Sequence, residues 1–174
     1  MATNIIKYNR VAVLLHWLTA ALIIYMLIWG EGLIKSFSGT PSNPGLHISL
    51  GILILVLSVL RLVWRLMNPP PPDVPMSAWQ AKASHALHWA FYAVLILIPV
   101  SGMAALDKSI AGKHPEFADL TVFGLFSVPH FSLPAFGSAH GLFTNFTWAL
   151  LALHVLAALK HQFIDKDRLI NRMT

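Results

Sequence analysis

Four long apolar segments, separated by polar or proline-rich stretches, set the pattern of this chain. The first covers residues 11–30, which carry no formal charge. Further segments follow at about 46–67, 83–106 and 141–162. A helix rises about 1.5 Å per residue, so about 20 residues are needed to cross a hydrocarbon layer of about 30 Å. The pattern therefore predicts four membrane-spanning helices.

The connections between these segments are typical loop sequences. Residues 31–45 contain the run SGTPSNPG, and residues 68–82 open with Asn68 and four prolines, which cannot continue a helix. Residues 107–140 form a long connection rich in Gly, Pro, Phe and Ser, in which we expect a short interfacial helix at about 115–126. Residues 1–174 are thus interpreted as one transmembrane domain, an all-α four-helix bundle.

The composition supports a membrane protein and limits its chemistry. Charged residues make up 11% of the chain, whereas globular domains carry about 25%. The chain has no cysteine, which excludes covalent haem attachment through a CxxCH motif, a cysteine-ligated iron–sulfur cluster and a thiol nucleophile. Its nine histidines remain as candidate metal ligands, and imidazole suits iron, copper and zinc.

The basic residues predict the orientation in the membrane. Four spans place both termini on one side. Nine of the twelve Lys and Arg residues flank that side: Lys7, Arg10, Arg61, Arg65, Lys82, Lys160, Lys166, Arg168 and Arg172. Cytoplasmic loops are enriched in such residues, so we expect both termini to be cytoplasmic, in a bacterial inner membrane. The net charge of +5 follows this distribution and predicts the bilayer, not a nucleic acid, as the partner.

Two histidines of the fourth segment lie on one side of their helix. His140 and His154 are fourteen residues apart. At about 100° per residue they point within about 40° of each other, and they differ in depth by about 21 Å. Isolated capping or helix-crossing histidines are the alternative. An ionisable side chain at membrane depth is costly, however, and is usually functional.

The predicted topology gives each of four histidines a partner at the same depth. His16 lies about 9 Å from the inner face, and His154 lies at a similar depth, about 12 Å from it. His47 and His140 both lie at the outer mouth. Two imidazole pairs about 20 Å apart along the membrane normal are suited to two b-type haems, with His16 and His154 as inner and His47 and His140 as outer iron ligands.

Other residues on these helices have less specific patterns. Arg61 is fourteen residues after His47, so it faces the same way at the inner depth. It is a candidate partner for a haem propionate, and contact with lipid phosphate is an equal alternative, which we favour for Arg65. Gly51, one turn after His47, leaves room for a flat macrocycle or for a neighbouring helix.

The remaining histidines stay open to several interpretations. His85 and His88 begin the third segment and fit a ligand, proton-route, quinone-contact or interfacial role. His161 follows His154 by seven residues on the same face, where it fits a quinone carbonyl, a haem propionate or an interfacial side chain. His114 and His130 lie in the outer connection without a clear signal.

Most of the chain resembles the bacterial cytochrome b561 family. The resemblance covers residues 8–170 and is carried by RVAVLLHW, by LHISLGILILVLSVLRLVWRL with the proline run after it, by SHALHWAFYAVLILIPVSGM, and by AHGLFTNFTWALLALHVLAALKH. It implies haem ligation by His16, His47, His140 and His154, in agreement with the depth argument. The family often has Trp-His-Glu where this chain has Ala139-His140-Gly141.

The resemblance is strongest to the superoxide:ubiquinone oxidoreductase type of this family. It implies that periplasmic superoxide reduces the outer haem, that the electron passes to the inner haem, and that ubiquinone is the acceptor. A site for superoxide needs a positive potential, for which Lys35, Lys108 and Lys113 are the outer candidates. Four outer carboxylates oppose them: Glu31, Asp107, Glu116 and Asp119. The outer connection, where relatives differ most, makes the substrate the least secure inference.

Two other functions compete with this one. The first is an electron-transfer subunit that passes electrons between a periplasmic redox protein and the quinone pool. The second is a haem carrier without redox turnover. A transporter is disfavoured, because the spans show no inverted repeat and no intramembrane carboxylate. The sequence gives no prediction of the oligomeric state.

Overall fold

The computed structural model describes residues 6–34, 42–106, 120–128 and 133–174. The chain forms the helices α1 (Arg10–Ile34), α2 (Pro44–Met67), α3 (Ala78–Ala105), α5 (Pro134–Gly137) and α6 (His140–Phe163). Two short strands, β1 (Thr121–Val122) and β2 (Phe126–Ser127), and a 3-10 helix η2 (Leu169–Met173) complete the described part.

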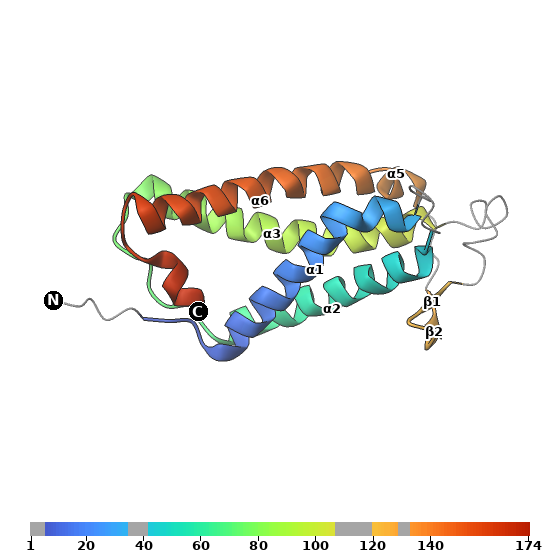
Figure 1. The fold of residues 1–174 in the computed structure, drawn as a ribbon, viewed down its shortest axis with the longest axis horizontal. Helices are drawn as coiled ribbons and strands as arrows, with labels where there is room; N and C mark the ends of the chain where they lie inside the picture. Colours follow the sequence, from blue (N-terminus) through green and yellow to red (C-terminus); the bar gives the residue numbers. More distant parts are fainter. Residues whose placement is uncertain (1–5, 35–41, 107–119, 129–132) are drawn as a thin grey trace.

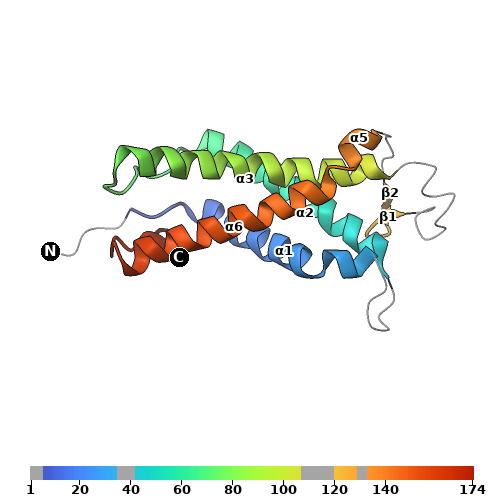
Figure 2. The ribbon, with the colours of Figure 1, turned by 90° about the horizontal axis from the view of Figure 1, so that it is seen from above.

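The long helices make an elongated bundle that is suited to a membrane. Helix α1 packs on α2, α2 on α3, and α3 on α6, with the helices running roughly along one axis (Figures 1 and 2). Four segments are long and apolar enough to span a bilayer: Arg10–Ile34, Pro44–Met67, Ala78–Ala105 and Pro134–Phe163. Many of their large apolar side chains, such as Leu14, Ile28 and Leu153, are exposed on the outside of the bundle. This is the all-α four-helix membrane fold that the pattern predicts.

Two small apolar clusters hold the bundle together. Ile23, Ile54 and Leu95 meet in its middle. At the end away from the C-terminus, Ile48 and Leu106 pack against the base of the hairpin: Leu120, Val122 and Val128. These clusters are small because most large apolar side chains of the helices face outward.

The first and last described residues lie together at one end of the bundle (Figure 1). The Lys7 ammonium donates to the Thr174 carbonyl at 3.1 Å, and the Tyr8 N–H donates to the Arg172 carbonyl at 3.0 Å. This end is called the inner end below, and the end that carries β1 and β2 is called the outer end.

Two helix boundaries differ from the expected ones: the start of α3 and the end of α1. Helix α3 begins at Ala78, five residues earlier than expected, because Ser77 and Gln80 form a capping box. The Ser77 N–H donates to Gln80 Oε1 at 3.0 Å, and the Ser77 hydroxyl donates to the same oxygen at 2.7 Å. The sequence S-x-x-Q is a recognised helix-start signal. Helix α1 continues to Ile34, four residues beyond the expected end.

The expected interfacial helix at about 115–126 is wrong in its described part. Residues 121–127 form an antiparallel hairpin, with Val122 opposite Phe126 and Thr121 opposite Ser127. Phe123 and Gly124 both have positive φ angles, of 49° and 73°, which is the geometry of a tight hairpin turn and not of a helix. Residues 115–119 lie outside the described part.

Candidate functional site: two pairs of facing histidines

The outer pair consists of His47 on α2 and His140, the first residue of α6. Their ring centres are 6.2 Å apart, and the ring planes are inclined at 63°. His47 is in the first turn of α2, where Asn43 caps the helix by accepting the Leu46 N–H at 2.9 Å. The helix starts thus bring both imidazoles to the outer end, at matched depth.

Backbone carbonyls orient both outer imidazoles. His47 Nδ1 is 2.9 Å from the Gly30 carbonyl oxygen, and His140 Nδ1 is 2.9 Å from the Ile98 carbonyl oxygen. A carbonyl oxygen only accepts, so Nδ1 carries the proton in each contact and Nε2 keeps its lone pair. Metal-binding histidines commonly have this second hydrogen bond, which selects the tautomer and the ring orientation.

Glycines allow the neighbouring helices to approach these rings. A Cβ atom on Gly102 of α3 would lie 3.1 Å from His140 Cε1 and 3.2 Å from its Nδ1. A Cβ atom on Gly30 of α1 would lie 3.4 Å from His47 Cε1. A Cβ atom at position 102 would be closer to His140 than ordinary van der Waals contact allows, so the ring would have to shift by a few tenths of an ångström to accommodate it.

The inner pair consists of His16 on α1 and His154 on α6. Their ring centres are 6.3 Å apart and the planes are inclined at 57°. His16 Nδ1 is buried, and it has no hydrogen-bond partner among the described residues. His154 also contacts the edge of Phe91, with ring centres 5.4 Å apart. The inner rings are therefore held by packing, whereas the outer rings are held by hydrogen bonds.

Both separations agree with two imidazoles that share one metal ion. An imidazole nitrogen binds a transition metal at about 2.0 Å and lies about 1.1 Å from its ring centre, so two rings on opposite sides of one ion have centres about 6.2 Å apart. Neutral imidazole nitrogen is a donor that suits haem iron. The residues present thus fit one bis-imidazole iron centre at each end of the bundle.

A third imidazole lies beside the inner pair. His88 of α3 has its ring centre 6.0 Å from that of His154. This separation also satisfies the spacing criterion, so spacing alone does not distinguish His16 from His88. His85, one turn earlier, is exposed and bonded to Asp73, with Nε2 and Oδ2 3.0 Å apart. His88, and not His85, is the helix-three histidine that reaches the site.

Arg61 is placed near the inner end of the bundle, on the same helix as His47. Its guanidinium carbon lies 5.6 Å from the ring centre of Tyr92 on α3. Stacking on an aromatic face leaves the donors at the edge of the guanidinium available for an anion. Gly51 also lies on α2, and among the described residues no atom beyond the nearby backbone of its own helix comes within 4 Å of a Cβ atom built there. Both interpretations of Gly51, a flat macrocycle or a neighbouring helix, stay predictions.

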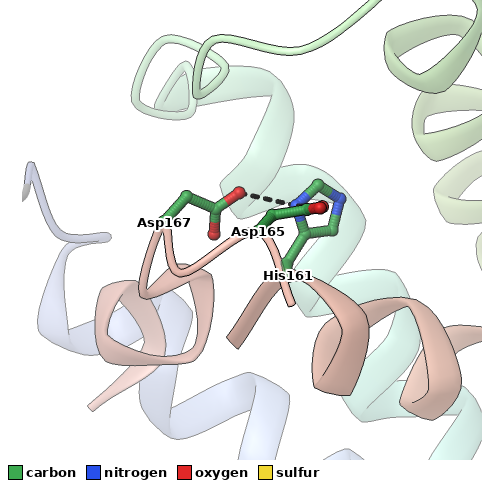
Figure 3. Close-up of side chains that lie close together, drawn as sticks. All are labelled: His161, Asp165 and Asp167. Atoms are coloured by element: carbon green, nitrogen blue, oxygen red, sulfur yellow. Dashed lines mark hydrogen bonds and ion pairs between the residues drawn. The ribbon is translucent and has the colours of Figure 1, made fainter. Parts of the chain in front are cut away.

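His161, in the last turn of α6, lies beside the carboxylates of two aspartates that follow the helix. Its Nδ1 is 2.6 Å from Asp167 Oδ2 and 3.3 Å from Asp165 Oδ2, and Figure 3 shows both carboxylates beside the ring. Lys160 pairs with Asp165. A cavity of about 330 Å³ opens next to them, lined by Pro75, Met76, Gln80, His161, Asp165 and Asp167. The two aspartates were not identified from the sequence as partners of His161. Asp165 is its i,i+4 neighbour, and Asp167 returns to the ring after left-handed backbone at Lys166.

Lys35, Lys108 and Lys113, together with His114 and His130, lie outside the described residues.

The family model described as prokaryotic cytochrome b561 matches residues 7–174. The chain belongs to the prokaryotic cytochrome b561 family. Membership makes it a membrane electron carrier and implies b-type haem as its cofactor, and the four spans make it a multi-pass membrane protein.

Similar curated proteins span the chain almost end to end. It is 33% identical to "Cytochrome b561 homolog 2" of Escherichia coli strain K12, over 96% of this chain and 90% of the relative. It is 32% identical to "Probable superoxide oxidase CybB" of Yersinia pestis, over 96% and 95%. It is 26% identical to "Cytochrome b562" of Cereibacter sphaeroides, over 95% and 94%.

Proposed function

We propose that this cytochrome b561 holds two haem b groups, one at each end of the bundle. His47 and His140 are the proposed ligands of the outer iron, and His16 and His154 those of the inner iron. The observation that carries the proposal is the recurrence of one ring separation, 6.2 and 6.3 Å, at two depths. His140 and His154 are fourteen residues apart on α6, so the two centres differ in depth by about 21 Å.

The chain's own residues prepare these two centres for iron. The carbonyls of Gly30 and Ile98 keep the outer Nε2 atoms unprotonated and available. At the inner centre, Arg61 is the proposed partner of a propionate, because a half-buried guanidinium on the inner part of α2 is stabilised by an anion. When bound, haem supplies one-electron redox chemistry that no amino-acid side chain of this chain provides.

The proposed net reaction transfers electrons from periplasmic superoxide to ubiquinone. Two superoxide anions each lose one electron and become O₂, and ubiquinone takes up the two electrons with two protons to become ubiquinol. Support comes from the family, whose members carry electrons in membranes, and from the name of the 32% identical relative. Lys35, Lys108 and Lys113 are the proposed outer charges that attract the superoxide anion.

We place both termini in the cytoplasm, with the protein in a bacterial inner membrane as a single domain. Nine of the twelve basic residues flank the end at which the first and last described residues meet. The positive-inside rule then makes that end cytoplasmic.

His161 lies at this end beside the cavity, and we propose it as a hydrogen-bond donor to ubiquinone, with a haem propionate as the alternative partner.

A superoxide pulse on the purified, oxidised protein tests this function. Stopped-flow absorbance at the haem α-band is expected to show reduction at a rate close to the diffusion limit, followed by reoxidation on addition of ubiquinone. Haem content per chain, measured on the same sample as a pyridine complex, is expected to be two. A single haem per chain would refute the two-centre proposal without deciding the substrate.

A second candidate function is an electron-transfer subunit between a periplasmic redox protein and the quinone pool. It is favoured by the 33% identical relative, whose name specifies a cytochrome b561 without a substrate. In that case the di-haem spectrum is unchanged, superoxide reduces the haems slowly, and ubiquinol reduces them readily. This result would reject superoxide oxidation and retain the family function.

A further inference from the structure

We propose that the hairpin at the outer end, residues 120–128, inserts its turn into the outer leaflet of the bilayer. Three apolar side chains surround the turn and are largely exposed: Phe123 at 51%, Leu125 at 79% and Phe126 at 55%. The nine residues of the hairpin, LTVFGLFSV, contain no charge. This proposal does not depend on the electron donor or acceptor.

The base of the hairpin is built into the protein, so the turn has a definite position. Val122 and Val128 are 3% and 2% exposed, and they pack with Leu120 against Ile48 and Leu106. The base of the hairpin therefore belongs to the hydrophobic core. The apolar side chains at its tip do not pack in that core and stay exposed.

The depth of the turn favours lipid over a soluble partner. The Phe123 N–H donates to the Ser49 hydroxyl at 2.9 Å, and this serine donates in turn to the Gly45 carbonyl at 2.7 Å. Ser49 is five residues inside α2, about 7.5 Å from its start. Helix α2 has 24 residues. It is therefore about 36 Å long, and centring it on about 30 Å of hydrocarbon puts Ser49 inside the apolar layer.

The direction of the hairpin agrees with that depth. It runs to the side of the outer end of α2, away from α6, and not onward along the bundle axis (Figure 1). A segment that leaves the bundle sideways at this level lies along the membrane interface. Aromatic and aliphatic side chains are typical of protein segments that enter the boundary between headgroups and acyl chains.

Part of the hairpin backbone is paired within the protein. Besides the Phe123 N–H, the Leu125 N–H donates to the Val122 carbonyl at 2.9 Å and the Val128 N–H to the Leu120 carbonyl at 3.1 Å. These bonds lower the cost of bringing the turn to the boundary between headgroups and acyl chains, where water still reaches the remaining backbone groups. Phe123 has a φ of 49°, at a turn position that usually takes Asn, Asp or Gly. A bulky apolar residue is kept there despite that strain, which favours a role for its side chain.

Site-directed spin labelling of the haem-loaded, full-length protein tests the proposal. The chain has no cysteine, so Leu125→Cys accepts a single label. The protein is reconstituted in phosphatidylethanolamine–phosphatidylglycerol vesicles, and label collisions with O₂ and with a water-soluble nickel chelate are compared. Lys82→Cys is the aqueous reference, and Leu153→Cys on the exposed face of α6 is the lipid reference.

The label at 125 is expected to collide with the nickel chelate several-fold less than the label at 82, and to approach the behaviour of the label at 153. Nickel collisions equal to those at 82 would overturn the proposal. Spin–spin broadening at 125 that disappears on dilution with unlabelled protein would also overturn it, in favour of contact with a second copy. Phe126→Cys repeats the measurement at a second tip position, and an unchanged haem spectrum verifies folding of each variant.

Discussion

His88 and His154 face each other between α3 and α6, with ring centres 6.0 Å apart and planes inclined at 70°. The inner site therefore contains three imidazoles, because His16 lies 6.3 Å from the same ring. Only two of them can hold one iron on opposite sides. His154 is common to both possible pairs, so the choice is between His16 and His88.

We predict that His16→Ala loses the inner haem and that His88→Ala retains it. Helices α1, α2 and α6 supply one complete pair at each end, whereas the described part of α3 offers no histidine at the outer end. Haem content per chain, measured as a pyridine complex, is expected to fall from two to about one in the first variant. Loss of haem in His88→Ala with retention in His16→Ala would transfer the ligand role to His88. His85→Ala, at an exposed position, is the control.

Gly102→Ala is predicted to displace the outer haem. The new Cβ atom would lie 3.1 Å from His140 Cε1, so the ring must shift by a few tenths of an ångström, which disturbs its contact with the Ile98 carbonyl that orients it. We expect the outer haem occupancy to fall by more than about half, in line with the loss of a ligand's supporting contact. Absorbance spectra of the purified variant measure this change. Gly141→Ala is the matched control, because among the described residues no atom beyond the nearby backbone of its own helix comes within 4 Å of a Cβ atom at that helical position.

Removal of the Arg61 charge is predicted to lower the midpoint potential of the inner haem. A nearby positive charge stabilises the reduced iron, which carries one more electron. At an effective dielectric constant of about 20, a unit charge roughly 10 Å away changes a one-electron equilibrium by about 1.7 kcal/mol, or about 70 mV. Redox titration of Arg61→Gln should show a decrease of that order. Arg61→Lys, which keeps the charge, should show a much smaller one, and equal shifts in both variants would argue against an electrostatic role.

His161→Phe is predicted to slow ubiquinone reduction without loss of either haem. The imidazole lies beside the cavity at the inner end, and phenylalanine keeps its size while removing the donor. We expect turnover with ubiquinone to fall about tenfold or more, since loss of one hydrogen bond to a reacting group has this effect. Asp167→Asn should give a smaller decrease, because it alters only the group that orients His161. A change in the inner haem potential with normal quinone kinetics would assign His161 to a propionate instead.

Arg172→Met is predicted to weaken the inner end of the protein. This arginine is 6% exposed, and it donates from Nε to the Ile6 carbonyl at 3.0 Å and from Nη2 to the Pro72 carbonyl at 2.7 Å. It thus joins the N-terminal lead, the α2–α3 loop and the C-terminal segment. Loss of two charge-assisted hydrogen bonds is expected to cost about 2–4 kcal/mol of stability. Thermal loss of the haem spectrum measures the effect, and Arg10→Ala, at an exposed position, should change it little.

The number and course of the four spans could be predicted from the sequence because hydrophobic length alone decides them. The sequence also predicted that His16 lies at the depth of His154 and His47 at the depth of His140, because the rise per residue of a straight helix converts residue number into depth. Sequence periodicity did not reveal how close His88 comes to His154, which depends on the packing of α3 against α6. The hairpin at 120–128 was missed because an apolar run with one glycine is equally compatible with an interfacial helix.

The residues around the site were harder to predict than its histidines. Gly30, Ile98 and Gly102 act through backbone atoms or through the absence of a side chain, so their roles appear only when the helices are assembled. Asp167 reaches His161 because Lys166 and Arg168 adopt left-handed backbone, which is uncommon for either residue type. The spacing of Ser77 and Gln80 is a signal for the start of α3, but the expected start at residue 83 did not use it.

The different support of the two histidine pairs has a consequence for how the cytochrome is assembled in the cell. The outer imidazoles are already oriented by the carbonyls of Gly30 and Ile98, so they lose little side-chain freedom when iron arrives. His16 Nδ1 has no such partner among the described residues, so packing alone limits the rotation of the ring, and it has more side-chain freedom to lose when iron binds. When haem is scarce during biogenesis, half-loaded molecules are therefore expected to carry their single haem at the outer end, and the inner end completes maturation.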